Sequence, residues 1–326
     1  MSDATGARHF GRRTTADEVV AGHDLCDRTM IVTGANTGIG FDTARALAAA
    51  GARVILACRN PDAGADAAER IRAAHPGARA ESAVLDLASL ASVRAFCDAL
   101  DAPVIDALIC NAGLASLRWD TTEDGFERTV GVCHIGHFLL TQRLLPRLLA
   151  APAPRVIMVS SESHRSPRRL DFDRLPMTER NFSGLGAYGQ AKLCNLLMAK
   201  ELQRRYGDRG LMACALHPGT LVSTEIGRNS GAVALLMKLV SPFTKSCSQG
   251  AATTVLAAVC EPAGEIAGRY LSDCRVTASS AESEDPAVAA RLWALSEQWV
   301  GETSSAVAGG AAESASGSTS GSTSGS

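Results

Sequence analysis

The chain has 326 residues, 46% of them hydrophobic, which is enough to bury the core of one large α/β domain. Its formal net charge is −2 and its basic clusters are no longer than pairs of arginines, so nucleic-acid binding is not expected. The sequence has no run of about 18 apolar residues, which argues against a membrane span.

Ten cysteines are spread along the chain, and no two of them form a Cys-x-x-Cys pair. Cys58, Cys110 and Cys214 lie inside apolar runs, where cysteine behaves as a small hydrophobic residue. We therefore predict reduced thiols in a cytoplasmic protein and no metal site. Residues 1–13 are polar and charged and do not form a signal-peptide pattern.

Residues 1–24 form a polar N-terminal arm, in which Thr14 or Thr15 caps a short helix. After the arm, strands and helices alternate, which predicts a single Rossmann-type α/β domain over residues 25–302: a doubly wound parallel sheet of about seven strands with helices on both faces. The strand runs are almost continuously apolar, which fits a parallel sheet buried on both faces. In chain order, the predicted elements are a strand at 29–33, a helix at 38–50, a strand at 53–58, a helix at 61–74, a strand at 80–85, a helix at 89–100, a strand at 107–110, a helix at 129–149, a strand at 155–160, a helix at 187–206, a strand at 212–216, a helix at 249–260 and a strand at 269–271.

Two long segments, residues 162–186 and 218–247, interrupt the alternation after a strand. Ligands of a doubly wound sheet bind at the carboxyl ends of its strands, so we assign both loops to substrate enclosure, with surface insertion as the alternative. The apolar residues 232–240 and 242–243 predict a lid for a lipophilic substrate. Residues 303–326 are rich in Gly, Ser, Thr and Ala and predict a disordered tail.

A glycine-rich turn, Thr-Gly-Ala-Asn-Thr-Gly-Ile-Gly at residues 33–40, joins the first strand to the first long helix. Glycines let the backbone approach a pyrophosphate, whose charge is stabilised by the helix N-terminus. A tight structural turn is the alternative interpretation. The predicted cofactor-binding residues of this turn are Gly34, Asn36, Thr37, Gly38, Ile39 and Gly40.

Residues at the ends of the following strands extend this cofactor site. Arg59 follows the second strand where an acidic residue would bind a free ribose hydroxyl, so NADP(H) is favoured over NAD(H), unless Arg59 is only an exposed strand-end charge. Asp86 can accept a hydrogen bond from the adenine amino group. The further predicted cofactor contacts are Leu87, Asn111, Ala112 and Gly113.

Tyr188 and Lys192 are four residues apart, and on a helix such residues share one face. Tyrosine has a pKa of about 10, and a neighbouring ammonium lowers it, so Tyr188 can donate a proton at neutral pH. Lys192 can also hold the nicotinamide ribose, and Ser161 can donate a hydrogen bond to a substrate oxygen. With the glycine turn, these residues predict hydride transfer coupled to proton transfer.

The combined motifs resemble the short-chain dehydrogenase/reductase superfamily over residues 12–302, and within it the branch of retinol dehydrogenases and WW-domain-containing oxidoreductases. The resemblance implies catalytic roles for Ser161, Tyr188 and Lys192. It also implies homodimers or homotetramers, and nicotinamide contacts for Pro218, Gly219 and Thr220. The matching segments are residues 33–40, 57–60, 85–96, 111–113, 136–138, 159–164, 188–195 and 217–219.

Two residues depart from the family pattern. The family has an asparagine, which helps to hold a water near the active-site lysine, at the position of Cys133 in the segment 132–138. A thiol is a weak donor and acceptor, so either another group completes the proton relay, or turnover is slow, or the reaction is unusual. Phe41 follows the last glycine of the turn, where some family members carry a Lys or Arg toward the 2′-phosphate.

The leading hypothesis is an NADP(H)-dependent carbonyl reductase or alcohol dehydrogenase for a lipophilic ketone, aldehyde or alcohol. A steroid-like, polyketide or other secondary-metabolite carbonyl is compatible with it. The alternatives are a nucleotide-binding regulatory protein and a non-redox homologue, both motivated by Cys133. We expect His134 and His137 to pack beneath the site, and His164 is a candidate substrate contact.

Overall fold

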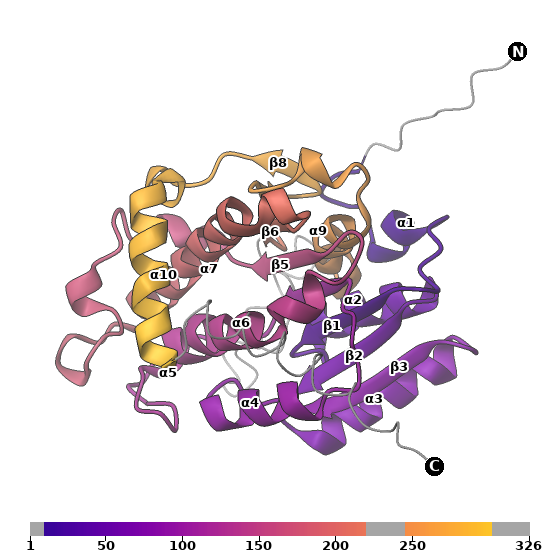
Figure 1. Ribbon diagram of the computed structural model, residues 1–326, viewed down its shortest axis with the longest axis horizontal. Coiled ribbons are helices and arrows are strands. Elements are labelled where there is room, and N and C mark those ends of the chain that lie inside the picture. The colour runs from indigo at the N-terminus through magenta and orange to yellow at the C-terminus, as the bar shows by residue number, and fades with distance from the viewer. Residues whose placement is uncertain (1–9, 220–244, 302–326) are drawn as a thin grey trace, which may run out of the picture.

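An eight-stranded sheet runs through the centre of the molecule and separates two layers of helices (Figure 1). The computed structural model describes residues 10–219 and 245–301. The strand order is β3-β2-β1-β4-β5-β6-β7-β8, and only the β7–β8 pair is antiparallel. The predicted doubly wound α/β fold is therefore confirmed. The strands are β1 (Thr29–Thr33), β2 (Arg53–Cys58), β3 (Arg79–Val84), β4 (Ala107–Cys110), β5 (Arg155–Val159), β6 (Met212–His217), β7 (Tyr270–Ser272) and β8 (Arg275–Thr277).

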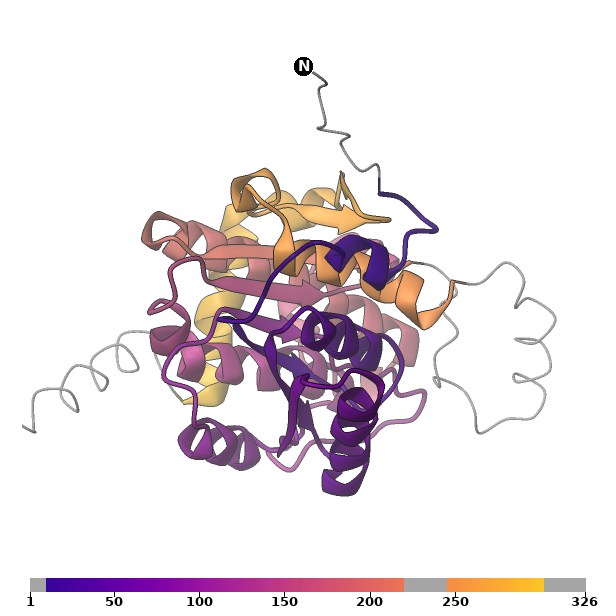
Figure 2. The same ribbon diagram turned by 90° about the vertical axis from the view of Figure 1, so that its right-hand side faces the viewer.

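Each face of the sheet has its own hydrophobic core, because successive side chains of a strand point to opposite faces. Ile31 of β1 lies in one core and the next residue, Val32, lies in the other. In Figure 2 the indigo and purple helices face the viewer and the C-terminal yellow helix lies behind them. One layer contains α4 (Leu90–Ala99), α6 (Gly136–Leu148) and α7 (Gly184–Tyr206), and the other contains α1 (Ala16–Val20), α2 (Gly38–Ala49), α3 (Pro61–Ala74) and α9 (Cys247–Val259).

The strand β3 differs from the prediction that the strands are buried on both faces. It lies at one end of the strand order, and five of its six residues are exposed or half-buried. Val84 is 53% exposed. An edge strand carries polar residues such as Glu81 and Ser82 because one side has no partner strand.

The helix boundaries agree with the predicted ranges to within a few residues, with one exception. The helix predicted at 129–149 is divided into α5 (Arg128–Val130), a π-helical turn η1 (Gly131–Ile135) and α6. Of the two predicted N-caps, Thr14 and Thr15, it is Thr15 that caps α1, through a capping box with Glu18. The short 3₁₀ segments are η2 (Glu162–Arg165), η3 (Phe172–Arg174), η4 (Glu179–Asn181), η5 (Gly207–Arg209), η7 (Ala263–Glu265) and η8 (Ala281–Glu284).

Two C-terminal elements were not predicted. The strand β8 pairs with β7 across a two-residue turn, and both turn residues, Asp273 and Cys274, have positive φ angles of 51° and 61°. Such angles are typical of type I′ hairpin turns. The helix α10 (Pro286–Val300) begins with Asp285, whose carboxylate accepts hydrogen bonds from two amides of the first turn.

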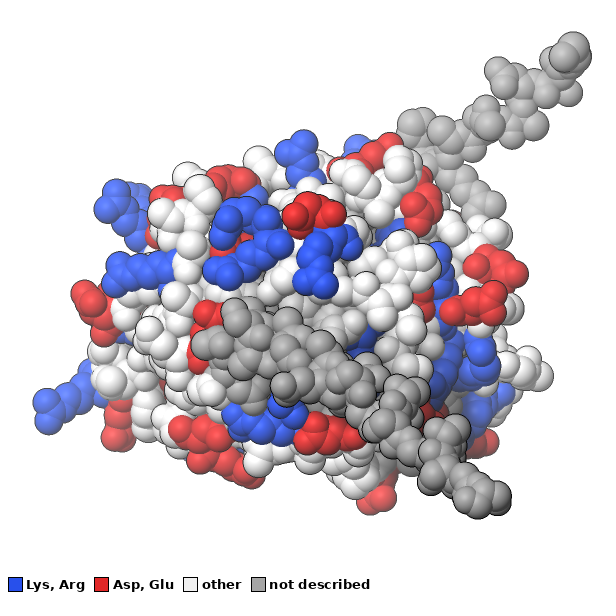
Figure 3. Space-filling model, viewed as in Figure 1, with Lys and Arg blue, Asp and Glu red and all other residues white. Residues whose placement is uncertain are grey.

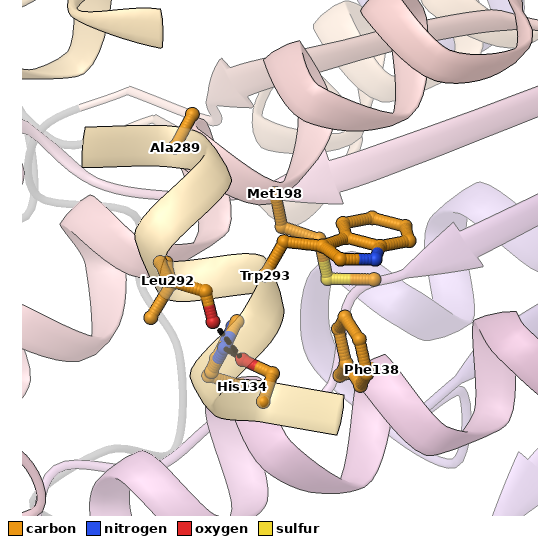
Figure 4. A pocket seen from close by; sticks show the side chains of 7 residues that line it. His134, Phe138, Met198, Ala289, Leu292 and Trp293 are labelled. Carbon is orange, nitrogen blue, oxygen red and sulfur yellow. Dashed lines mark hydrogen bonds between the residues drawn. The ribbon is translucent and has the colours of Figure 1, made fainter. Parts of the chain in front are cut away.

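The helix α10 covers the π-turn and the adjoining part of α6 and α7 (Figures 1 and 4). Trp293 packs edge-on against Phe138, with ring centroids 5.0 Å apart. The ring nitrogen Nε2 of His134 lies 2.8 Å from the hydroxyl of Ser296. These side chains line a narrow pocket together with Met198, so the outer face of this helical layer is filled by aromatic packing.

Arg155 joins the start of β5 to the end of α9. Its side chain is 6% exposed, and its guanidinium donates to the carbonyl oxygens of Ala257 at 3.0 Å and Cys260 at 2.9 Å. A cation at a helix C-terminus is stabilised by the helix dipole. Arg155 therefore supplies partners to carbonyl groups that the helix itself leaves unpaired.

Positive and negative side chains are interspersed on the surface that Figure 3 shows. This agrees with the small net charge of −2. None of the helices in the described part of the chain combines the length and the apolar character that a membrane crossing requires.

Candidate active site

The glycine-rich turn fits a dinucleotide phosphate. Gly34 and Gly38 have positive φ angles of 64° and 61°, which side chains with a Cβ rarely adopt. A Cβ on Gly40 would lie 2.4 Å from the carbonyl oxygen of Gly34, so the turn can close only around glycine. Thr37 caps α2 without a side-chain hydrogen bond to any described residue, which leaves first-turn amides for an anion. Asn36 and Ile39 are half-buried in the same turn.

The end of β4 packs directly against this turn. The side chain of Asn111 donates from Nδ2 to the carbonyl oxygen of Thr33 at 2.8 Å. The backbone amides of Asn111 and Ala112 both donate to the hydroxyl of Thr33 at 2.9 Å. A Cβ on Gly34 would lie 3.0 Å from Ala112, so small residues on both segments permit this contact. The two predicted cofactor segments thus form one surface at the carboxyl edge of the sheet.

The predicted adenine-side residues lie at the ends of β2 and β3. Arg59 is exposed directly after β2. Asp86 is half-buried, and its carboxylate accepts a hydrogen bond from the amide of Ala88 at 2.9 Å. Leu87 is buried, and its carbonyl oxygen would lie 2.4 Å from a Cβ on Gly136, so Leu87 packs against the start of α6.

Tyr188 and Lys192 lie on α7 beside the end of β5. The ammonium of Lys192 lies 5.5 Å from the centroid of the Tyr188 ring and donates to the carbonyl oxygen of Val159 at 3.0 Å. Asn195 donates to the same carbonyl at 3.2 Å, and the hydroxyl of Ser160 donates to the Lys192 carbonyl at 2.7 Å. Lys192 is 3% exposed, so its charge acts on Tyr188 with little screening by water.

Ser161 is half-buried and begins the η2 segment. Its hydroxyl accepts from the amide of Ser163 at 3.2 Å and lies 3.3 Å from the hydroxyl of that residue. His164, a candidate substrate contact, uses both of its ring nitrogens for bonds within the protein. It is buried, its Nδ1 bonds to the carbonyl oxygen of Ser161 at 2.7 Å, and its Nε2 accepts from the amide of Ser280 at 3.2 Å. His164 therefore fastens the Ser161 backbone to the C-terminal part of the chain.

Cys133 lies in the π-turn next to Lys192. A Cβ built on Gly113 would lie 3.2 Å from the Lys192 ammonium and 3.3 Å from the Cys133 sulfur. The thiol donates to the carbonyl oxygen of Leu114 at 3.5 Å and is fully buried. The residue that departs from the family pattern is thus in the immediate surroundings of the lysine.

The end of β6 carries Pro218 and Gly219, whereas Thr220 and the apolar residues 232–240 and 242–243 lie outside the described residues. Lys245, which the sequence did not single out, donates to the Pro218 carbonyl at 3.3 Å and forms an ion pair with Asp273. Gly219 has a φ of 115°, and a Cβ there would lie 2.5 Å from the Lys245 side chain. Lys245 therefore holds the backbone of this segment.

Two large apolar side chains, Leu117 and Leu185, are 77% and 74% exposed. Leu185 lies one helical turn before Tyr188, on the same face of α7. Leu117 packs at the start of that helix, since its Cα would lie 3.0 Å from a Cβ on Gly184. The sequence alone could not show that these two leucines are neighbours, because only the fold brings their segments together.

The comparisons with known proteins agree with this geometry. The sequence profile of the short chain dehydrogenase family matches residues 28–171. The WW domain-containing oxidoreductase of Danio rerio is 48% identical over 307 residues, which span 91% of this chain and 74% of that protein. Retinol dehydrogenase 12 of Mus musculus is 42% identical, with 84% and 86% of the two chains covered. The crystal structure of an uncharacterized protein from Mycobacterium paratuberculosis is 35% identical with a TM-score of 0.70, covering 87% of this chain and 97% of that chain. The protein therefore belongs to the short-chain dehydrogenase family of oxidoreductases.

Proposed function

We propose that the protein is an NADP(H)-dependent carbonyl reductase or alcohol dehydrogenase for a lipophilic ketone, aldehyde or alcohol, with Tyr188 as the proton donor. The observation that carries this proposal is the placement of Tyr188 and the buried Lys192 ammonium at the sheet edge that bears the glycine turn. The carboxyl ends of the strands are where doubly wound sheets bind nucleotides.

In the proposed reduction, a reduced nicotinamide cofactor held by the glycine turn and the strand ends would supply the hydride to the carbonyl carbon. Tyr188 gives its phenolic proton to the carbonyl oxygen, which becomes the alcohol hydroxyl, and the phenolate regains a proton from solvent. The Lys192 charge stabilises that phenolate. Ser161 donates a hydrogen bond to the same substrate oxygen; its 3.3 Å contact with the Ser163 hydroxyl is long enough to be exchanged for it.

The substrate class is supported by Leu117 and Leu185. Apolar side chains exposed by more than 70% at one helix end are unfavourable in water unless a ligand or partner covers them. Leu185 lies one turn from Tyr188 and Leu117 packs against the start of the same helix, so an apolar arm of the substrate would gain contacts there while its carbonyl reaches the phenol. We assign the loop residues 162–186 and 218–247 to the enclosure of that substrate.

The cofactor preference rests on Arg59 and yields a prediction. Replacing Arg59 with Ala removes a charge-assisted hydrogen bond to the 2′-phosphate and should weaken NADPH binding roughly tenfold to a hundredfold, while NADH binding stays the same. Fluorescence titrations with both nucleotides measure the two dissociation constants. Arg209→Ala is the matched control, because Arg209 precedes β6 and so lies at the amino end of a strand, whereas Arg59 follows the carboxyl end of β2. Equal losses for both nucleotides would contradict the role in 2′-phosphate recognition.

A second prediction concerns Cys133. The substitution Cys133→Asn restores the hydrogen-bonding group of the family next to Lys192, so kcat should be unchanged or higher. Steady-state kinetics at several pH values test this, and Cys133→Ser separates the effect of polarity from that of size. A collapse of kcat in Cys133→Asn together with full activity of Cys133→Ser would show that the site requires a small side chain.

The proposed function is tested by mixing the purified protein with NADPH and a panel of ketones and aldehydes of increasing apolar length. We expect consumption of NADPH, followed at the reduced-nicotinamide absorbance band, with kcat/KM rising with apolar length. NADPH binding without turnover across the panel would instead favour a regulatory nucleotide-binding protein or a non-redox reaction. The same panel without protein gives the background rate.

The cellular setting and the assembly belong to the same proposal. The buried thiols of Cys110 and Cys214 are unpaired, which fits a reducing compartment such as the cytoplasm. Size-exclusion chromatography with light scattering would decide between a monomer and the homodimer or homotetramer that the family resemblance implies.

A further inference from the structure

A buried histidine, His137, lies beside the π-turn, and its hydrogen bonds have no part in the proposed chemistry. In η1 the backbone hydrogen bonding is wider than in an α-helix, since the amide of Gly136 donates to the carbonyl of Gly131. Single π-turns inside α-helices are frequent at functional sites. His137 follows this turn at the start of α6, and it is fully buried.

Both ring nitrogens of His137 have partners. Nδ1 lies 3.1 Å from the carbonyl oxygen of Cys133, and Nε2 lies 2.9 Å from the hydroxyl of Thr33. A carbonyl can only accept, so Nδ1 carries the proton, and Nε2 accepts the hydroxyl proton of Thr33. Burial lowers the pKa of His137 to about 4, so the ring stays neutral at physiological pH. The geometry therefore defines a single tautomer.

The Thr33 hydroxyl connects this ring to the end of β4. Its oxygen accepts the amides of Asn111 and Ala112, each at 2.9 Å, while its proton goes to His137. Thr33 is itself the first residue of the glycine turn. One chain of hydrogen bonds thus runs from the π-turn to two segments of the proposed cofactor site.

The same segments lie close to Lys192. A Cβ built on Gly113, the residue after Ala112, would lie 3.2 Å from the Lys192 ammonium and 3.3 Å from the Cys133 sulfur, and the ammonium donates to the carbonyl oxygen of Val159 at 3.0 Å. His137 bonds to the backbone of the π-turn and, through Thr33, to the end of β4. It therefore joins two of the segments that lie close to the lysine.

We propose that His137 is a positioning residue that holds the π-turn against the end of β4 and so fixes the Lys192 ammonium beside Tyr188. The proposal rests on the oxidoreductase function proposed above. Without the two hydrogen bonds, Cys133 and Gly113 can move relative to each other, and the position of the nearby lysine ammonium is less restricted.

A purely structural role of His137 predicts a different outcome for the variants. It predicts that loss of His137 lowers the stability of the fold but leaves the chemistry of the folded enzyme unchanged. His134 offers a matched control, because it is also fully buried in the same segment but bonds to Ser296 of α10. Its ring contacts among the described residues, Ser296, Phe138 and Trp299, are not part of the proposed site.

The experiment compares His137→Phe, His137→Asn and His134→Phe. An asparagine amide reaches the Nδ1 position and retains the bond to Cys133, but it is too short to reach Thr33. For each protein we would measure kcat and KM with NADPH and the best carbonyl of the panel, the pH profile of kcat, and the melting temperature. Turnover by the unchanged protein tests the proposed function separately, before any variant is considered.

We expect His137→Phe to lower kcat on the order of tenfold to a hundredfold, because small displacements of a catalytic group cost that much. The pH profile of kcat should shift, since the charge beside Tyr188 has moved, and His137→Asn should recover part of the loss. His134→Phe should lower the melting temperature without changing kcat or its pH profile. A folded His137→Phe with the kcat and pH profile of the unchanged protein would overturn the proposal.

If His137→Phe does not fold, Thr33→Val removes the hydrogen bond between Thr33 and His137 from its other end. Valine has nearly the same volume as threonine. This substitution should produce the same shift of the kcat profile, and an unchanged profile would overturn the proposal equally. A readout independent of turnover is the nitrogen NMR signal of the imidazole, in which we expect a neutral, Nδ1-protonated ring for His137. A protonated or Nε2-protonated ring at pH 7 would also contradict it.

Discussion

Replacing Tyr188 with Phe should abolish carbonyl reduction, with a loss in kcat of about 10²- to 10⁴-fold. The phenylalanine ring keeps the contact with the Lys192 ammonium, which lies 5.5 Å from the ring centroid, so the only group removed is the proton donor. Cofactor binding should be unchanged, because the turn and the strand ends that form its proposed site are not altered. Stopped-flow kinetics and an NADPH titration on the same preparation separate the two effects.

Tyr206→Phe is the control for this experiment. It makes the same substitution at the C-terminal end of the same helix, where the ring packs 6.4 Å from Trp293. Its kcat should equal that of the unchanged protein. Turnover by Tyr188→Phe at a similar level would rule out Tyr188 as the proton donor and would direct attention to the Ser161 hydroxyl.

Replacing Arg155 with Met should destabilise the fold by about 2–4 kcal/mol. The substitution leaves the carbonyl oxygens of Ala257 and Cys260 without their donor, and an unsatisfied buried acceptor costs about 1–3 kcal/mol. The favourable interaction of the cation with the C-terminus of α9 is lost as well. Urea denaturation followed by circular dichroism measures the change in the free energy of unfolding.

Two further measurements show whether the loss of stability is specific to the buried Arg155. Arg70→Met breaks a surface ion pair with Asp66, in which both side chains are more than half exposed, and should cost at most about 1 kcal/mol. NADPH affinity of folded Arg155→Met should be normal, because Arg155 begins β5 and the proposed site lies at the other end of that strand. A free energy of unfolding within about 0.5 kcal/mol of the unchanged protein would show that water replaces the guanidinium.

The sequence predicts the central sheet and the glycine turn because their signals are local. A buried parallel strand such as β4 is a short apolar run, and the turn after β1 needs glycines at fixed positions. The pairing of Tyr188 with Lys192 follows in the same way from the helical repeat. Each of these features depends on residues within a few positions of one another.

The helix α10 carried a usable signal that the sequence analysis missed. Ala289, Leu292, Trp293, Ser296 and Val300 are its buried residues, and their spacing follows the helical repeat. Asp285 and Pro286 mark its start in the manner of a capped helix. The β8 strand had no such signal, because its three residues are exposed.

Other features depend on contacts between distant segments and could not be predicted from local pattern. The π-turn lies where Gly136 approaches the carbonyl of Leu87, a close contact that only a glycine permits. His164 was a candidate substrate contact because it lies next to the active-site loop, but its Nε2 accepts from the amide of Ser280, 116 residues away. Lys245 reaches Pro218 in the same way across the chain.

The position of α10 in the chain has a consequence for biosynthesis. Domains form as the chain emerges from the ribosome N-terminus first, so α6 and α7 are complete well before Trp293 is available to Phe138. Until then the aromatic surface beside His134 is exposed to solvent. A nascent or truncated chain that stops before Pro286 should therefore bind holdase chaperones or aggregate, whereas the same chain extended to Val300 should not.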